Sequence, residues 1–576
     1  MFEERFRRSR RLRRLALLQL AAGALGMAAA GLAAPPPAVS GNVPVNSPQQ
    51  LFPNDNPSRN TSSLAASPDG RRLLAAFEDL QGLCGSPGGL QCPPEKPNGL
   101  SSFSFSTDGG ATWTDAGGVS PIGSATTAGH PWVDRLGRSA GVESADGRDP
   151  GIYFLVSRLQ DQTSGAAAGI GIYRGHFGGG DTFSLDNATV INSANPAGDE
   201  YSRQAIAAAK DGSASAYVVL VNVDEICGVP LAGFGQIELW STHDGGDTWS
   251  GPSIVVADGA DITDPQNPNC GATGHLQVAP ALAIGPKREI YVVWQSGPQF
   301  FADGSNGDTD AIAFARSLDG GKTFSKPGVV VDINAMRANP PVGYAKNRMN
   351  DQARIAVDTS GPHRGRIYVS FYQPVAPVAG PPGQQQSTSS QAYVTFSDDR
   401  GNTWSAPTPV AAAVPATGVK RFWTTVTTRA SGDVDVVYLE SQEAATGTAC
   451  SVAFNPTSFR TGPLNSLVDT FWVQSRDGGA TFSSPVRVST QTSNWCLAPY
   501  QFDALLQADG FLVSNAGDYI GTASVDNRTL VLWPDDRNGP MDTFFGSVSG
   551  VATVHHHQAG APAGGGAPAS GGSNDE

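Results

Sequence analysis

The chain is 576 residues long and contains 69 Gly and 42 Pro, which disfavours long helices and favours many short strands joined by turns. This length is ample for a large core, and a repeat fold of such length need not divide into several domains. The formal charge is −14, and such an acidic body argues against nucleic acid and anionic membrane surfaces as partners.

The first 34 residues have the pattern of an export signal. A basic stretch from Arg5 to Arg14 precedes an apolar stretch from Leu15 to Ala34, and small residues at 28 and 30 offer a cleavage site. A cleaved signal peptide is the preferred interpretation, and a retained N-terminal anchor is the alternative, because about 20 apolar residues can span a bilayer. We therefore expect an exported protein, periplasmic or extracellular, with no membrane contact beyond this segment.

One octapeptide pattern recurs through the rest of the chain: Ser or Thr, any residue, Asp, any residue, Gly, any residue, Thr, and then Trp or Phe. The copies are Ser106–Trp113, Thr242–Trp249, Ser317–Phe324, Ser397–Trp404 and Ser475–Phe482, and their start-to-start spacings are 136, 75, 80 and 78 residues. The first spacing is about twice the others, and a decayed copy that keeps Thr182 and Phe183 divides it. Repetition at this period is typical of a fold built from similar units.

The octapeptide is an Asp box, and over residues 41–550 the chain resembles the BNR-repeat proteins of the sialidase-like β-propeller superfamily. In each copy, Gly permits a tight turn, the Asp and Ser or Thr side chains bond backbone N–H groups, and the aromatic residue fills space between sheets. We interpret the box Asp residues as structural and not catalytic. They are Asp108, Asp244, Asp319, Asp399 and Asp477.

Four β-like runs accompany each octapeptide, two before it, one leading into it and one after it. In one unit these runs are 282–284, 290–294, 312–316 and 329–331. Four antiparallel strands per period make a propeller blade. Six units carry the octapeptide or its remnant, and a seventh, at 517–549, has none. We therefore predict an all-β, seven-bladed β-propeller over residues 35–550, closed by pairing of residues 42–46 with the last unit; six blades, as in sialidases, are the alternative.

Candidate site residues gather on the face opposite the octapeptides, which is the substrate face in sialidases. Three arginines precede their inner strands at odd offsets, so they share one side of those strands. The resemblance implies an arginine cluster for a substrate carboxylate, a Tyr nucleophile activated by Glu, and an Asp acid. The matching residues are Arg203, Arg354 and Arg421 for the cluster, Tyr519 for the nucleophile, Glu440 for its partner and Asp79 for the acid.

Two functions follow from these residues. One is an exo-acting glycoside hydrolase on anionic, sialic-acid-type glycans, which the arginines on the inner strands favour. The other is a non-catalytic propeller that binds glycan or protein, which is favoured because the Arg-Ile-Pro signature of sialidases is absent. In either case we expect a monomer whose partner is a glycan or an extracellular protein.

Six cysteines in an exported chain predict disulfides. Placing them in the loops of the substrate face pairs neighbours, and the predicted bridges are Cys84–Cys92, Cys227–Cys270 and Cys450–Cys496. Each bridge would pin a long loop over that face. Buried free thiols are the alternative if the chain is not exported.

Two remaining segments bear on cofactors and order. The loop from Asp303 to Asp310 offers oxygen ligands of the kind that Ca²⁺ prefers, but it lacks EF-hand spacing, so a solvated turn is preferred and we expect no cofactor. Residues 551–576 are rich in Gly, Ala and Pro and predict a disordered tail.

Overall fold

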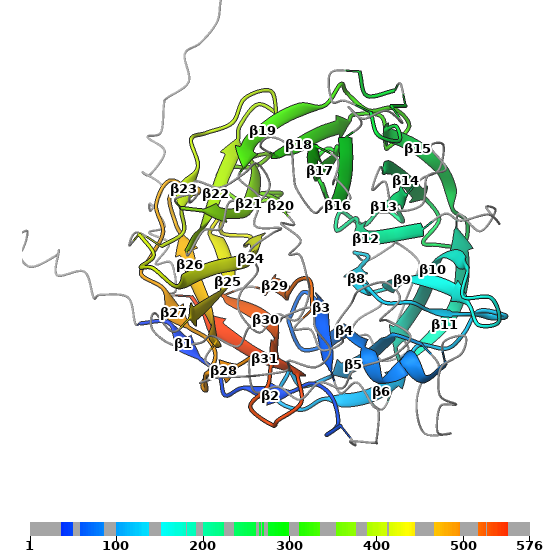
Figure 1. Cartoon of the computed structure of the whole chain (residues 1–576), viewed down its shortest axis with the longest axis horizontal. Coiled ribbons are helices and arrows are strands. Elements are labelled where there is room, and N and C mark those ends of the chain that lie inside the picture. Colours follow the sequence, from blue (N-terminus) through cyan, green and yellow to red (C-terminus); the bar gives the residue numbers. More distant parts are fainter. Residues whose placement is uncertain are drawn as a thin grey trace, which may run out of the picture. The chain divides into compact units, whose positions relative to one another are not determined.

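Short strands make up nearly all of the secondary structure in the computed structural model of the chain (Figure 1). The model describes residues 36–49, 58–85, 99–137, 151–179, 181–191, 200–223, 235–260, 264–266, 268–269, 275–298, 310–333, 353–375, 389–411, 414–443, 466–495, 517–525 and 527–550. None of the helical structure in these ranges is long and apolar enough to cross a membrane. The residues from Pro37 to Gly550 form one compact unit. The predicted signal segment and the predicted tail lie outside the described residues.

Among the described residues, the strands form six hydrogen-bonded sheets, and all strand pairs except one are antiparallel. The first four sheets along the chain are β3 (Arg59–Ala66), β4 (Leu73–Asp79), β5 (Ser101–Ser106) and β6 (Thr114–Gly118); β7 (Ala125–Thr127), β8 (Trp132–Arg135), β9 (Tyr153–Asp161), β10 (Ala167–Phe177) and β11 (Phe183–Ile191); β12 (Glu200–Ala208), β13 (Ala216–Val223), β14 (Gln236–Thr242) and β15 (Ser250–Val256); and β16 (His275–Ile284), β17 (Ile290–Pro298), β18 (Asp310–Ser317) and β19 (Gly328–Ile333). The short 3-10 helix η1 (Leu80–Gly85) follows β4.

The remaining strands belong to two sheets. The larger contains β20 (Arg354–Val357), β21 (Ile367–Pro374), β22 (Ser390–Ser397), β23 (Thr408–Pro409), β24 (Val419–Thr428), β25 (Val434–Glu443), β26 (Ser466–Ser475), β27 (Val486–Arg487) and β28 (Ser493–Asn494). The last sheet contains β29 (Gly521–Val525), β30 (Arg528–Asp535), β31 (Asp542–Ser549), β1 (Ala38–Val39) and β2 (Val43–Pro44).

The number of separate sheets differs from the seven blades that the sequence predicted. Five sheets have four or five strands each, and the sixth has nine. The nine-stranded sheet arises because β22 and β24 pair in parallel at Ser390 and Lys420, which joins the strands before and after this point into one sheet. The all-β propeller architecture is as predicted, with the sheets arranged as blades around a centre (Figure 1).

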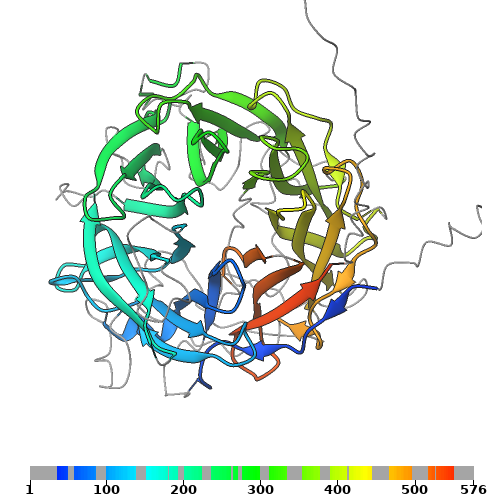
Figure 2. The same ribbon diagram turned by 180° about the vertical axis from the view of Figure 1, so that it is seen from behind.

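The two ends of the propeller chain meet in one sheet. Val43 and Pro44 of β2 pair with Phe545 and Phe544 of β31, which confirms the predicted pairing of residues 42–46 with the last unit. Strand β1 pairs with β31 as well, so the first and last strands lie side by side in both views (Figures 1 and 2). No open strand edge is left between the two ends of the chain at this position.

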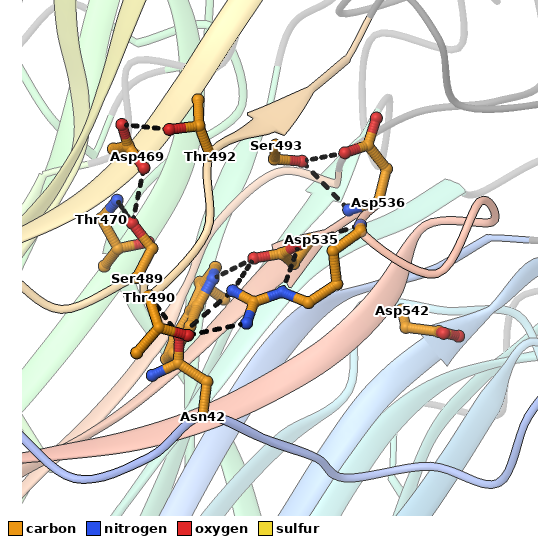
Figure 3. A network of polar contacts seen from close by, with 12 residues as sticks. Asn42, Asp469, Thr470, Ser489, Thr490, Thr492, Ser493, Asp535, Asp536 and Asp542 are labelled. Atoms are coloured by element: carbon orange, nitrogen blue, oxygen red, sulfur yellow. Dashed lines mark hydrogen bonds and ion pairs between the residues drawn. The ribbon is translucent and has the colours of Figure 1, made fainter.

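Asn42 fastens the N-terminal segment to two neighbouring sheets (Figure 3). Its Oδ1 accepts hydrogen bonds from the hydroxyl of Thr490 at 2.8 Å and from Nη2 of Arg537 at 3.1 Å, and its Nδ2 donates to the Val488 carbonyl at 3.0 Å. The guanidinium of Arg537 also bonds Asp535, which fixes its orientation. A single side chain thus bridges the end of the nine-stranded sheet and the closing sheet.

The five octapeptides adopt one hydrogen-bonding pattern. In Ser397–Trp404, the Ser397 hydroxyl donates to Oδ1 of Asp399 at 2.8 Å and accepts from the Gly401 N–H at 2.8 Å, and the Thr403 hydroxyl donates to Oδ2 of Asp399 at 2.7 Å. Equivalent bonds recur in the other four copies. The Asp side chain therefore ties its own turn together.

The octapeptide of each unit packs against the unit before it. The ring of Trp404 lies 5.3 Å from that of Phe314 in the preceding sheet, and Trp113 lies 5.3 Å from Phe545 of the closing sheet. A Cβ built on Gly401 would come within 2.1 Å of Phe314. The fifth position is therefore glycine because the neighbouring sheet leaves no room for a side chain.

Candidate functional site

The inner strands carry a repeated backbone irregularity close to where they begin. The register of β3, β12, β16 and β24 shifts by a bulge. The residue in each bulge has a positive φ, an uncommon conformation for a residue with a side chain. These residues are Thr61 (49°), Arg203 (54°), Ala279 (55°) and Trp423 (47°), and His130 ahead of β8 has a φ of 54°. Backbone strain of this kind is concentrated at functional sites, so the starts of these strands are candidates for a functional site.

Arg354, the first residue of β20, lies against two aromatic rings that also contact each other, with 5.1 Å between their ring centres. Its guanidinium carbon is 4.4 Å from the ring centre of Trp132 and 4.8 Å from that of Tyr519. The residue is only 6% exposed, and its Nη1 and Nη2 have no hydrogen-bond partner among the described residues. Burial lowers the pKa of Arg354 to about 10, so it remains cationic at neutral pH. A buried cation with unused donors is a site for an anion.

Tyr519, whose ring contacts both Arg354 and Trp132, is 3% exposed. Its hydroxyl donates a hydrogen bond of 2.9 Å to the Pro131 carbonyl. Burial, the largest cause, raises the pKa of Tyr519 well above its usual value. The phenol is therefore neutral, with its proton engaged by the backbone.

Four charged side chains act electrostatically on Tyr519. Arg354 and Arg203 lower the pKa of Tyr519, and Glu78 and Asp518 raise it, although burial remains the largest cause. Nη1 of Arg203 and Oε2 of Glu78 are buried atoms for which the described residues supply no hydrogen-bond partner. Glu78, at the end of β4, is 7% exposed. We call Arg203, Arg354, Tyr519, Glu78 and the pair described next the inner-strand site.

The pair joins His130 to Asp518. Nε2 of His130 lies 3.1 Å from Oδ2 of Asp518, and the Thr61 hydroxyl accepts the Asp518 N–H at 3.0 Å. These residues come from three different sheets, so the pair holds the strand starts together at this end. It also fixes Asp518 directly beside Tyr519.

The structure brings together some of the residues predicted from the sequence and separates others. Arg203, Arg354 and Tyr519 share the inner-strand site. Arg421 instead binds Glu440, with 2.8 Å between Nε and Oε2, and Asp79 binds Arg59, with 2.9 Å between Oδ2 and Nε. Both are cross-strand partners in register, Arg421 opposite Glu440 and Arg59 opposite Asp79. Opposite charges in such positions pair with each other, so the structure does not place Glu440 at the hydroxyl of Tyr519.

The sequence did not assign roles to Glu78, Asp518 or His130. Glu78 and Asp518 each adjoin a residue that was assigned one, Asp79 and Tyr519, and alternation along a strand sends neighbours to opposite faces. His130 lies three residues before Val133 of β8. Arg203 and Tyr519 likewise lie three residues before Ile206 and Thr522 of their own inner strands. That match is visible only once β8 is known to be an inner strand.

A channel of about 620 Å³ runs below the inner-strand site, and Arg354 and Trp132 line it. The rest of its wall consists of inner-strand residues and the turns after them. They include 62–64, 133–134, 206–211, 282–286, 355–357, 425–428 and 520–522. Arg354, at the start of β20, is therefore the residue through which the inner-strand site reaches a cavity that is large enough for a small ligand.

The cysteine and calcium predictions fall outside the described part of the chain. Cys92, Cys227, Cys270, Cys450 and Cys496 are not described, nor is the side chain of Cys84, and the same holds for residues 303–309. Within the described ranges, no three His, Cys, Asp or Glu side chains are arranged to hold a metal ion.

No family model matches the chain, and no curated protein is significantly similar to it in sequence. Several solved structures resemble its fold. An α-L-arabinanase of Penicillium chrysogenum complexed with arabinobiose is 11% identical, with a TM-score of 0.37 over 89% of this chain and 99% of that one. A sialidase of Trypanosoma rangeli in complex with sialic acid is 12% identical, with a TM-score of 0.38 over 88% and 74%.

YCF48 bound to a peptide is also similar, at 10% identity and a TM-score of 0.34, over 89% of this chain and 95% of that one. At these identities and scores the similarities concern the fold. Conclusions about function therefore depend on the inner-strand site.

Proposed function

We propose that this protein is an exported β-propeller that binds a carboxylate-bearing glycan at the inner-strand site, with Arg354 as the anchor. The observation that carries the proposal is the guanidinium of Arg354, 6% exposed and with two unpartnered nitrogens. Leaving a buried charge unpaired is costly, and a bound carboxylate would remove that cost through two parallel N–H···O bonds. Nη1 of Arg203 offers a further donor nearby.

The two aromatic rings that Arg354 contacts support this role. Trp132 and Tyr519 hold the guanidinium plane in place before any ligand arrives, at 4.4 and 4.8 Å from their ring centres. A donor that is already oriented loses little side-chain entropy on binding. Trp132 also lines the cavity, and an aromatic side chain there suits the apolar face of a sugar ring, which favours a glycan over a peptide as the ligand.

Calorimetric titration with the methyl glycoside of N-acetylneuraminic acid tests the proposal. We expect binding by the wild-type protein and a loss of at least about tenfold in Arg354→Lys, which keeps the charge but not the paired N–H geometry. Arg487→Lys is the matched control, because Arg487 on β27 is exposed, pairs with Asp469 and does not line the cavity. Absence of binding by the wild-type protein, or equal affinity in Arg354→Lys, would refute the proposal.

Hydrolysis is a second candidate function, favoured by the carboxylate of Glu78 close to Tyr519. In this version Tyr519 is the nucleophile, Glu78 takes the role first given to Glu440, and the two arginines hold the substrate carboxylate. The Tyr519 hydroxyl must first leave the Pro131 carbonyl, because a buried neutral phenol is a weak nucleophile.

A fluorogenic sialoside assay between pH 4 and 8 decides between the two functions. Hydrolysis requires product release by the wild-type protein and its loss in Tyr519→Phe. Tyr173→Phe is the control, because it removes another buried phenol that donates to a backbone carbonyl. If the wild-type protein releases no product but binds the glycoside, the protein is a binder.

We also propose that the ring has seven blades, with the nine-stranded sheet counted as two. Within that sheet, a Cβ on Gly479 of the second octapeptide would meet Tyr368 of β21 at 3.2 Å, the same kind of docking that joins separate sheets. Only one residue pair connects β22 to β24. A high-resolution experimental map that resolves the strands around the ring tests this count.

A further inference from the structure

The inner-strand site holds two buried charges of opposite sign that do not pair with each other. Arg354 contributes the cationic nitrogens Nη1 and Nη2, and Glu78 contributes the anionic oxygen Oε2. Both residues are more than nine-tenths buried, at 6% and 7% exposure. One segment contacts both residues: Gly129 lies against the Glu78 carboxylate, and Trp132, three residues later, lies against the Arg354 guanidinium.

Tyr519 contacts Arg354 and makes no hydrogen bond to Glu78. Its ring stacks on the Arg354 guanidinium at 4.8 Å, and its pKa responds to both charges. The Tyr519 hydroxyl does not satisfy Glu78, because it donates to the Pro131 carbonyl. Oε2 of Glu78 is thus left without a donor from within the described residues.

Glu78 is also held in position by the backbone beside it. A Cβ on Gly129 would lie 2.6 Å from Oε1 of Glu78, so the carboxylate fits closely against this glycine, whose φ is +94°. The adjoining residue, His130, is already engaged with Asp518 and leaves Glu78 free. A fixed carboxylate with an unused oxygen is a receptor for a hydrogen-bond donor, most strongly for a cationic one.

We infer that the inner-strand site selects a zwitterionic ligand, a sugar acid with a free amino group, whose carboxylate faces Arg354 while its ammonium faces Glu78. This inference deepens the proposed function and rests on it. An N-acetylated sugar acid offers the same carboxylate with only a neutral amide in place of the ammonium. It would satisfy Arg354 and leave the charge of Glu78 uncompensated.

Matched probes test the selection. Calorimetric titration at pH 7 would compare the methyl glycoside of neuraminic acid, whose amine is free, with that of N-acetylneuraminic acid. We expect the free amine to bind at least about tenfold more tightly, as a charge-assisted hydrogen bond predicts. In Glu78→Gln the ratio should fall to near one through weaker binding of the amine. Methyl glucosaminide, an amine without the carboxylate, should bind far more weakly than either.

The outcomes separate this inference from the proposal beneath it. If both glycosides bind equally and Arg354→Lys weakens both, the carboxylate site stands and the zwitterion selection is wrong. If neither binds, the proposed function fails and this inference fails with it. Asp332→Asn, on the exposed outer strand β19, is the charge-matched control, and a fall in the ratio there would also overturn the role of Glu78. Thermal melts would verify that Glu78→Gln is folded.

Discussion

The fifth residue of each octapeptide is under a different constraint from the fourth, although both have positive φ. At the fourth position φ is 77° in Gly320 and 61° in Arg400, so a residue with a side chain is tolerated there. At the fifth position, Gly401 faces Phe314 of the preceding sheet, and a Cβ would lie 2.1 Å from that ring. The tight turn accounts for the fourth residue, and contact between sheets accounts for the fifth.

This difference predicts unequal costs for the same substitution. Gly320→Ala should cost about 1–2 kcal/mol of unfolding free energy, the price of a left-handed backbone, because its nearest neighbour is 3.9 Å away. Gly401→Ala should cost about 1–3 kcal/mol more, because the ring of Phe314 must move. Urea unfolding of the two variants measures this. Equal costs would show that the sheets can separate slightly without penalty.

Pairs of charged residues mark the limit of prediction at the residue level. The sequence identified Arg421 and Glu440 as polar residues of one face, but their roles depended on which partner each would meet. The register settles this, because Arg421 stands directly opposite Glu440 on β25. By contrast, Arg354, Trp132 and Tyr519 come from the units of three different sheets and contact one another. The spacing of residues along the sequence does not reveal such a contact.

At the level of elements, the octapeptide turns depend on an ionised aspartate. Hydrogen bonds from the hydroxyl and the N–H of Thr403 hold the pKa of Asp399 at about 2, below its ordinary value of 3.8. A carboxyl group with a lowered pKa binds protons less readily in the folded protein than in the unfolded chain. It therefore stabilises the fold above pH 3.8, and this contribution disappears as the pH falls towards 2.

Asp399→Asn should accordingly lower the melting temperature most near neutral pH. The difference from the wild-type protein should shrink as the pH is lowered from 5 to 2, because the protonated wild-type side chain resembles the amide. Thermal melts across this range measure the effect, with Asp332→Asn, on the outer strand, as the control. A difference that stays constant with pH would mean that Asp399 acts through shape and not through charge.

The strands themselves were largely predictable, because the octapeptides fix where the third strand ends and the fourth follows. The bulges in the inner strands were not. Thr61 and Trp423 have ordinary sequence surroundings, and the positive φ of each results from tertiary packing at the strand start and not from local propensity. The number of separate sheets also escaped prediction, because it depends on one bridge between Ser390 and Lys420.

At the level of the whole propeller, the N-terminal segment supplies strands β1 and β2 of the sheet that contains the last three strands. Asn42→Ala should lower the free energy of unfolding by about 1–3 kcal/mol, because the side chain makes hydrogen bonds to Val488, Thr490 and Arg537 in two sheets. Chemical denaturation measures the change. Asn187→Ala, at an exposed position of β11, is the control, and equal stability of the two variants would show that Asn42 does not fasten the ring.

The pairing of β1 with β31 has a consequence for how the chain folds. Ala38 pairs with Ser549, so the closing contact joins residues 511 positions apart, and a ribosome must make almost the whole propeller before that contact exists. Contacts between such distant residues slow folding, because a long loop must close before the contact forms. A circular permutant that links residues 37 and 550 and opens elsewhere would make this closure local. In the permutant, the order of synthesis would then no longer determine which blade forms last.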